Sequence, residues 1–152
     1  LRELGQGHEN DVTQMHALAV LIASAVRYET GATSSDTPAE EALELGRGVC
    51  QDHSHILSGL ARHLGFPARY VSGYLMMNDR VDQEAGHAWA EVHFEGLGWV
   101  GFDVSNGISP DARYVRVAIG LDYREAAPIT GLHHGNEDAT GDKVLVNIQV
   151  QQ

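Results

Sequence analysis

The hydrophobic pattern changes its period near Ala68, and this change constrains the fold more than any other feature of the sequence. Before it, apolar residues recur every three or four positions, as they do along one side of a helix. After it, apolar and polar residues alternate, as in a half-buried strand. A chain with helices in its first half and strands in its second half is predicted to form an α+β domain, with the helices packed on the sheet.

Three helices are predicted, each with a start and a stop signal. The first is expected to start at Asp11 and to stop at Gly31. In the second, Thr37 can cap the first turn, Glu40 can reach back to the Thr37 amide, and Gly46 ends the helix. The third is expected over residues 50–64.

Six strands are predicted from the alternation of apolar and polar residues in the second half. Their expected ranges are 69–77, 87–94, 98–104, 113–121, 129–134 and 143–150. Few of the connections between them are long enough to contain a crossover helix. The sheet is therefore expected to be mostly antiparallel.

The length and the charge limit what this chain can be. With 152 residues it can bury one full hydrophobic core, so we expect residues 1–152 to form a single domain. Because the sequence starts at Leu1 and not at a methionine, we expect this domain to be part of a longer chain. The net charge of −11 repels phosphate groups, so nucleic acids and anionic membranes are not expected partners.

The chain contains one cysteine, Cys50, which cannot form an internal disulfide. A lone cysteine is a buried apolar side chain, an incidental free thiol or a nucleophile. No apolar run approaches the ~18 residues of a membrane span, and no leader-peptide pattern opens the sequence. These features favour a reducing, cytoplasmic location.

The segment 46–52 places Cys50 at the predicted start of the third helix. Gly46 and Gly48 permit a tight turn and leave room for a molecule to approach the thiol. Unpaired backbone amides and the helix dipole favour the negatively charged thiolate at such a position. The pattern is typical of a nucleophile. The alternative is a small apolar residue packed beneath the helix.

A second segment, 86–92, begins a predicted strand with His87. A histidine next to a glycine at the head of a strand can face a cleft while the sheet holds it in place. Its ordinary pKa of roughly 6.5 suits a general base near neutral pH. The alternative is that His87 is merely one of nine histidines and happens to begin a strand.

A third segment, 98–103, is predicted to be the return strand of the same hairpin. A three-residue loop at 95–97 would place Asp103 opposite Trp89 and diagonal to His87, about 7–8 Å away between backbones. A two-residue loop would turn Asp103 to the opposite face. In the first register, the carboxylate can orient the imidazole toward a thiol.

These three segments resemble the sequence blocks of the transglutaminase-like superfamily, and most of all its bacterial branch of transglutaminase-like proteins and cysteine peptidases. The matching stretches are Gly48-Val49-Cys50-Gln51-Asp52, Gly86-His87-Ala88-Trp89-Ala90-Glu91-Val92 and Gly98-Trp99-Val100-Gly101-Phe102-Asp103. The resemblance implies a papain-like arrangement, in which a helix carrying the nucleophile packs on an antiparallel sheet. It also implies that Cys50 is the nucleophile, His87 the base and Asp103 the residue that orients the base.

The chain departs from the animal members of this family where the reaction's oxyanion would be stabilised. Those enzymes use a tryptophan upstream of the cysteine, whereas the tryptophans here are Trp89 and Trp99, both downstream. We expect the Cys50 backbone amide to be one oxyanion donor and Tyr28 or Gln51 to be the second. Trp89 is expected either in the core or beside the substrate cleft, where it would shield the histidine–carboxylate bond from water.

His53 is the main alternative base, because it lies one helical turn from Cys50. It would have to approach along the helix surface and has no evident carboxylate partner, so His87 is preferred. The chain also lacks the ligand spacings of zinc and calcium sites, and neither a metal nor a cofactor is expected. The histidines considered as ligands are His53, His55, His93, His133 and His134.

The expected reaction starts with attack of Cys50 on an amide carbonyl, which forms a thioester and releases an amine. Water resolves the thioester in a peptidase or amidase, and a lysine or polyamine resolves it in a transglutaminase. The resemblance favours hydrolysis. The expected partner is a protein or peptide substrate, with an amine acceptor in the case of transamidation. The alternative is a catalytically silent binding or scaffold module with a closed cleft.

Overall fold

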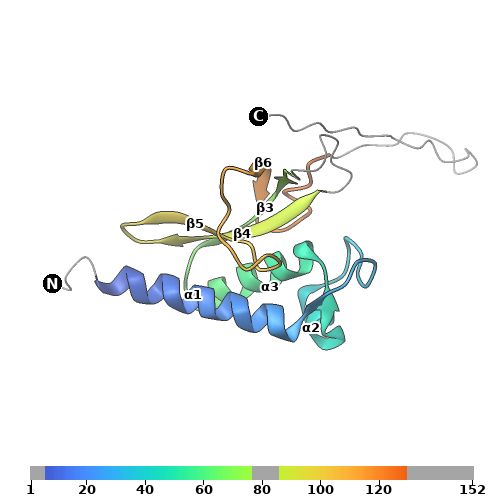
Figure 1. Ribbon diagram of the computed structural model, residues 1–152, viewed down its shortest axis with the longest axis horizontal. Coiled ribbons are helices and arrows are strands. Elements are labelled where there is room, and N and C mark those ends of the chain that lie inside the picture. Colours follow the sequence, from blue (N-terminus) through green and yellow to red (C-terminus); the bar gives the residue numbers. More distant parts are fainter. Residues whose placement is uncertain (1–5, 77–85, 130–152) are drawn as a thin grey trace, which may run out of the picture.

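The computed structural model describes residues 6–76 and 86–129 (Figure 1). These residues form α1 (Gln6–Ala25), β1 (Arg27–Tyr28), α2 (Ala39–Leu45), β2 (Arg47–Gly48), α3 (Cys50–His63), β3 (Ala68–Leu75), β4 (His87–Phe94), β5 (Gly98–Phe102) and β6 (Tyr114–Gly120). None of the described helices combines the length and the apolar character needed to cross a lipid bilayer.

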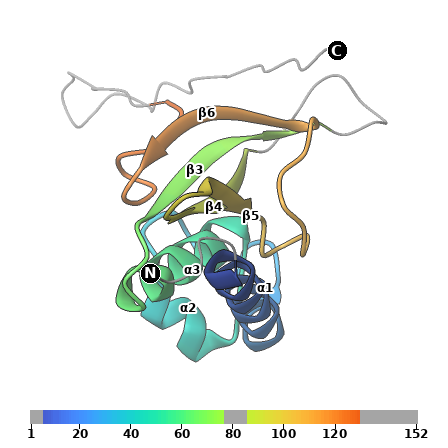
Figure 2. The ribbon, with the colours of Figure 1, turned by 90° about the vertical axis from the view of Figure 1, so that its left-hand side faces the viewer.

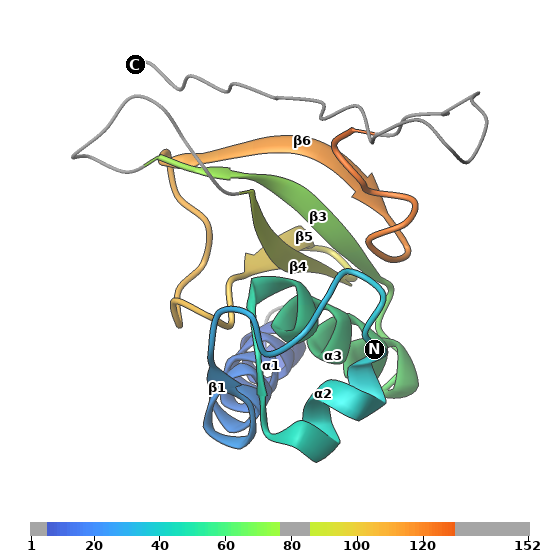
Figure 3. The same cartoon turned by 90° about the vertical axis from the view of Figure 1, so that its right-hand side faces the viewer.

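The main sheet has the strand order β5-β4-β3-β6, and all neighbours in it are antiparallel. β1 and β2 form a separate, short parallel pair. Figures 2 and 3 show the helices on one face of the main sheet, with α3 beneath β3 and β4. The predicted α+β class and the antiparallel sheet are confirmed.

The first helix differs from its prediction at both ends. α1 starts at Gln6, before Asp11, and ends at Ala25, well before Gly31. It ends there because the backbone turns away to pair with β2, and the Arg27 amide donates to the Gly46 carbonyl at 2.9 Å. This helix is therefore ended by the pairing of the next residues with β2, and not by the predicted glycine, Gly31.

The predicted cap of the second helix is wrong. α2 begins at Ala39, and Pro38 occupies the cap position without a side-chain hydrogen bond. The Thr37 hydroxyl instead accepts from the Ser34 amide at 2.9 Å, within the preceding turn. The predicted stop is confirmed, because Gly46 adopts the left-handed conformation, with φ 63°, that glycine tolerates best.

Four of the six predicted strands lie where the alternation placed them, and β4 matches its prediction residue for residue. β5 is shorter than predicted because the chain turns at Asp103, whose amide donates to the Ile108 carbonyl at 2.9 Å. The predicted strand 143–150 lies outside the described residues. So does 129–134, apart from Ile129, which is not in a strand.

The core lies between the helices and the sheet. α3 buries Ile56, Leu57 and Ala61 against Val92 and Phe94 of β4. Near the first turn of α3, a smaller cluster of Tyr70, Ala88 and Ala126 packs against Cys50. The packing of α3 therefore also fixes where its first residue lies.

The opposite face of the sheet also buries side chains of β4. Trp89 alternates along β4 with the core residues of that strand and is only 2% exposed. Beside it, buried Glu91 accepts from the Arg69 Nε at 2.7 Å and also pairs with Arg116. These charged side chains compensate one another, which allows a carboxylate to be buried there.

Gly73 of β3 is expected to be indispensable for this packing. A Cβ at residue 73 would lie 2.8 Å from the Trp89 ring and would overlap the Val115 carbonyl oxygen, which is backbone and cannot rotate away. Gly73→Ala should lower the free energy of unfolding by about 2 kcal/mol in urea titrations. The control is Gly59→Ala, at an exposed position of α3 with open space around it, which should stabilise the protein slightly. Equal effects of the two substitutions would contradict this account.

Candidate active site

Cys50 is the first residue of α3, and a buried carboxylate holds the turn that precedes it. The fully buried Asp52 accepts from the Val49 amide at 2.7 Å and from the Thr33 hydroxyl at 2.6 Å. A Cβ at Gly48 would lie 2.7 Å from the same carboxylate oxygen. Gly48 is therefore needed so that Asp52 can close the first turn and fix the position of the thiol.

His87 and Asp103 meet through the register of the β4–β5 hairpin. Phe94 pairs with Gly98, so the loop has the predicted three residues. The His87 Nε2 lies 2.6 Å from the Asp103 Oδ2, and the Asp103 side chain is inaccessible to solvent. The carboxylate can only accept here, so Nε2 carries a proton that it donates to Asp103.

The environment of His87 favours its protonated ring. Burial favours the neutral form, but the contacts with Asp103 and Cys50 and their negative charges outweigh it and raise the pKa of His87 to about 9. Burial similarly opposes ionisation of Asp103, yet its hydrogen bonds and the charge of His87 hold its pKa below the ordinary value. The structure thus brings together the three residues that the sequence singled out, with the imidazole between thiol and carboxylate.

The two candidates for the second oxyanion donor, Tyr28 and Gln51, have different surroundings. Tyr28 pairs with Gly48, two residues before Cys50, and is half exposed. Burial and the negative charges of Cys50 and Asp103 raise the pKa of Tyr28, so its hydroxyl keeps its proton. The Gln51 side-chain amide instead donates to the Ser35 carbonyl at 3.1 Å. Within the described residues, the Gln51 amide is bound to the adjacent loop and the Tyr28 hydroxyl is not.

Trp89 is buried next to His87. The centroids of the two rings are 6.4 Å apart, and the edge of Tyr114 packs against the indole at 5.4 Å. With only 2% of its surface exposed, Trp89 presents almost none of its ring to a substrate. This position suits the shielding role considered from the sequence better than a substrate platform.

The alternative base, His53, is held by structural hydrogen bonds. Its Nε2 donates to the Val26 carbonyl at 2.7 Å, and its Nδ1 lies 2.8 Å from the Ser105 hydroxyl. Both ring nitrogens are therefore engaged away from Cys50. Within the described residues, no group of three or more metal-binding side chains is close enough to hold a metal ion. His133 and His134 lie outside those residues.

Sequence reasoning missed two residues that bind the Asp103 carboxylate. The Asn106 side-chain amide and the Tyr114 hydroxyl both donate to Oδ2, at 2.6 and 2.7 Å. The Asn106-Gly107 pair is a turn signal that could have placed Asn106 near Asp103. Tyr114 carries no such signal, because its position depends on the pairing of β6 with β3.

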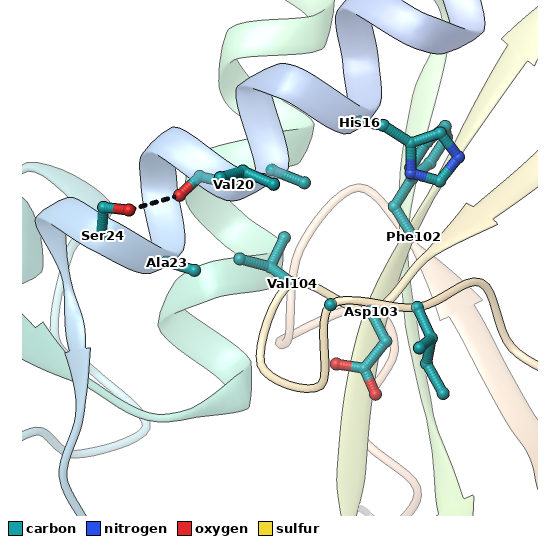
Figure 4. Close-up of a pocket in the computed structure, with 10 residues that line it drawn as sticks. His16, Val20, Ala23, Ser24, Phe102, Asp103 and Val104 are labelled. Atoms are coloured by element: carbon teal, nitrogen blue, oxygen red, sulfur yellow. Dashed lines mark hydrogen bonds between the residues drawn. The ribbon is translucent and has the colours of Figure 1, made fainter.

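A pocket of about 440 Å³ lies between α1 and the turn after β5 (Figure 4). His16, Val20, Phe102 and Val104 are among the residues that line it. Asp103 borders it, but Figure 4 shows the carboxylate directed away from Val20. Because neither Cys50 nor His87 lines the pocket, it is separate from the thiol–imidazole pair.

Comparison with known proteins identifies the family. Residues 1–104 match the family model of the transglutaminase-like superfamily. The chain belongs to this superfamily. It is 35% identical over 130 residues to an uncharacterized protein of Mycobacterium leprae, covering 82% of this chain and 46% of that one. It is 33% identical over 150 residues to an uncharacterized protein of Mycobacterium tuberculosis, covering 90% and 47%. The chain thus spans about half the length of these superfamily relatives.

The fold is shared with a solved structure that is also similar in sequence. The crystal structure of a candidate cysteine protease from Cytophaga hutchinsonii is similar, with a TM-score of 0.67 and 32% sequence identity. The match covers 76% of this chain and 38% of that chain. The transglutaminase-like fold implied by the sequence is therefore confirmed.

The charge state of His87 is testable without a substrate. We expect an NMR titration of the histidine rings to show a pKa of about 9 for His87, and Asp103→Asn to lower that pKa by about 2, because burial then opposes the charge without the carboxylate. The stability contributed by the charged ring should be complete below pH 6.5 and lost as the pH rises through about 9. Asp111→Asn, which removes an exposed carboxylate paired with Arg113, is the control. A His87 pKa near 6.5 in all three proteins would refute the coupling.

Proposed function

We propose that this protein is a cysteine-dependent enzyme that cleaves peptide or side-chain amide bonds through a thioester on Cys50. The observation that carries the proposal is the arrangement of one imidazole between a thiol at the start of α3 and a buried carboxylate at the end of β5. Because Nε2 of His87 is bound to Asp103, Nδ1 is the nitrogen left for Cys50. This is the arrangement that a thiol nucleophile, its base and an orienting group require.

In the first half of the proposed reaction, the Cys50 thiolate attacks the carbonyl carbon and a C–S bond forms. The carbonyl oxygen becomes an oxyanion, which the Cys50 backbone amide and the Tyr28 hydroxyl stabilise. His87 then gives the proton on Nδ1 to the amide nitrogen, the C–N bond breaks, and the amine leaves. The acyl group remains on Cys50 as a thioester.

In the second half, neutral His87 takes a proton from water while the water oxygen attacks the thioester carbonyl. The C–S bond breaks, the carboxylic acid leaves, and the thiolate–imidazolium pair is restored. An amine in place of water would give transamidation by the same steps. Hydrolysis is favoured, because the similar solved structure is that of a candidate cysteine protease.

Trp89 and Asp103 are proposed to support the base without touching the substrate. The buried carboxylate holds the ring orientation, and the indole excludes water from one side of the histidine–carboxylate bond. Excluding water strengthens such a bond, because it is no longer screened. His87 can therefore stay hydrogen-bonded to Asp103 through Nε2 throughout the cycle, both when its ring is charged and when it is neutral.

Cleavage of a protein substrate tests this function. We expect the purified protein to release new amino groups from a fluorescently labelled casein or a peptide library, and Cys50→Ala to reduce the rate by at least about a thousandfold. A thioester-linked acyl group should appear on intact wild-type protein by mass spectrometry of quenched reactions. Parallel reactions with a biotinylated alkylamine separate hydrolysis from transamidation. Unchanged cleavage by Cys50→Ala would contradict the mechanism, and no cleavage by either protein would favour a silent module.

The same assay distinguishes the two oxyanion candidates. Tyr28→Phe removes one hydroxyl and should lower kcat by about a hundredfold, because a donor to the oxyanion acts mainly in the transition state. Gln51→Ala should have little effect, since the Gln51 amide is bound to the loop at Ser35. The reverse order of effects would assign the donor to Gln51.

A further inference from the structure

Among the described residues, the Asp103 carboxylate accepts four hydrogen bonds. Its Oδ2 accepts from His87 Nε2 at 2.6 Å, from Asn106 Nδ2 at 2.6 Å and from the Tyr114 hydroxyl at 2.7 Å. Its Oδ1 accepts from the Asn106 backbone amide at 3.2 Å. Only the first of these donors belongs to the proposed reaction. The other donors need a separate explanation.

The direction of these bonds follows from the chemistry of the groups. An ionised carboxylate can only accept, so Asn106 presents its amide nitrogen and Tyr114 its hydroxyl proton. The Asn106 Nδ2 also lies 3.5 Å from His87 Nε2, but both nitrogens are donors in this arrangement, so they do not bond to each other. Asn106 and His87 therefore share one acceptor, and each limits how the other can move.

The two residues come from different parts of the fold. Asn106 lies in the turn after β5, where the Gly107 amide donates back to the Asp103 carbonyl at 2.8 Å. Tyr114 opens β6 and pairs with Leu75 at the far edge of the sheet. Its ring packs against both His87 and Trp89, with centroids 5.8 and 5.4 Å away. The carboxylate is thus held by the turn after β5 and by the first residue of β6.

We propose that Asn106 and Tyr114 are positioning residues for the reaction: they fix the plane of the Asp103 carboxylate and limit its attraction for the His87 proton. This inference rests on the proposed function of Cys50 and His87. Each hydrogen bond that Asp103 accepts spreads its negative charge away from the imidazole. The Nε2 proton therefore stays on His87, and the Nδ1 proton that goes to the leaving amine is held less tightly.

Several titratable groups face this pair and bear on the test. Cys50 faces His87 from α3, Tyr28 lies near Cys50 and Asp103 from β1, and Tyr114 reaches Asp103 from β6. Burial, together with the hydrogen bond and charge of Asp103, raises the pKa of Tyr114, so it stays a donor across the working pH range. A change seen between pH 6 and 10 can then be read from His87 with Cys50 replaced by serine.

The test is an NMR titration of His87 in Tyr114→Phe, made in the Cys50→Ser protein. Phe keeps the ring against Trp89 and removes only the hydroxyl. We expect the pKa of His87 to rise by about 0.5, because the carboxylate regains the charge that the hydroxyl had spread. Asn106→Leu should shift it in the same direction. Tyr74→Phe, which removes a hydroxyl from the neighbouring strand β3, is the matched control and should cause no shift.

The kinetic readout separates positioning from general packing. With Cys50 intact, Tyr114→Phe should lower kcat about tenfold and leave KM unchanged, because the hydroxyl touches no substrate. A His87 pKa that stays constant or falls in both Tyr114→Phe and Asn106→Leu would overturn the proposal, since loss of packing alone admits water and brings no rise. The titration needs no substrate, so a failure of the expected effect on His87 can be told apart from a failure of amide cleavage and of the proposed function.

Discussion

The site depends on the packing of α3 against β3 and β4. Leu57 and Ala61 of the helix are fully buried against the sheet, so the helix can neither rotate nor slide without opening the core. That packing fixes the first residue of the helix, Cys50, relative to the first residue of β4, His87. The thiol and the imidazole come from two different layers of the fold, and the core between those layers sets their distance.

Burial of charge is the second constraint. The buried carboxylates of Asp52, Glu91 and Asp103 each bind a different set of hydrogen-bond donors. Asp52 binds the Val49 amide and the Thr33 hydroxyl, and so serves the start of a helix. Glu91 binds two arginines on the far face of the sheet. Asp103 alone binds a histidine that faces a thiol. Two of these carboxylates thus have a structural role and the third has a role in the proposed chemistry. The partners of each carboxylate determine its role.

Much of this arrangement could be predicted from the sequence, because it depends on short-range patterns. The three-residue loop of the β4–β5 hairpin follows from the alternation on either side, and it alone places Asp103 on the side of His87. The start of α3 at Cys50 follows from helical periodicity. What could not be predicted depends on contacts between distant segments. α1 ends at Ala25 because β1 pairs with β2, and Tyr114 reaches Asp103 because β6 lies beside β3. No local pattern encodes either pairing.

The central claim is that Cys50 and His87 form a thiolate–imidazolium pair, and the rate of Cys50 alkylation tests it most directly. Since Cys50 is the chain's only cysteine, the mass of the intact protein after treatment with iodoacetamide reports that site alone. Alkylation should be fast at pH 6 in the wild type, slow at that pH in His87→Ala, and unchanged in His63→Ala, which alters an exposed histidine at the far end of α3. Equal rates for wild type and His87→Ala from pH 4 to pH 10 would show that the two residues are not coupled, and would contradict the proposed mechanism.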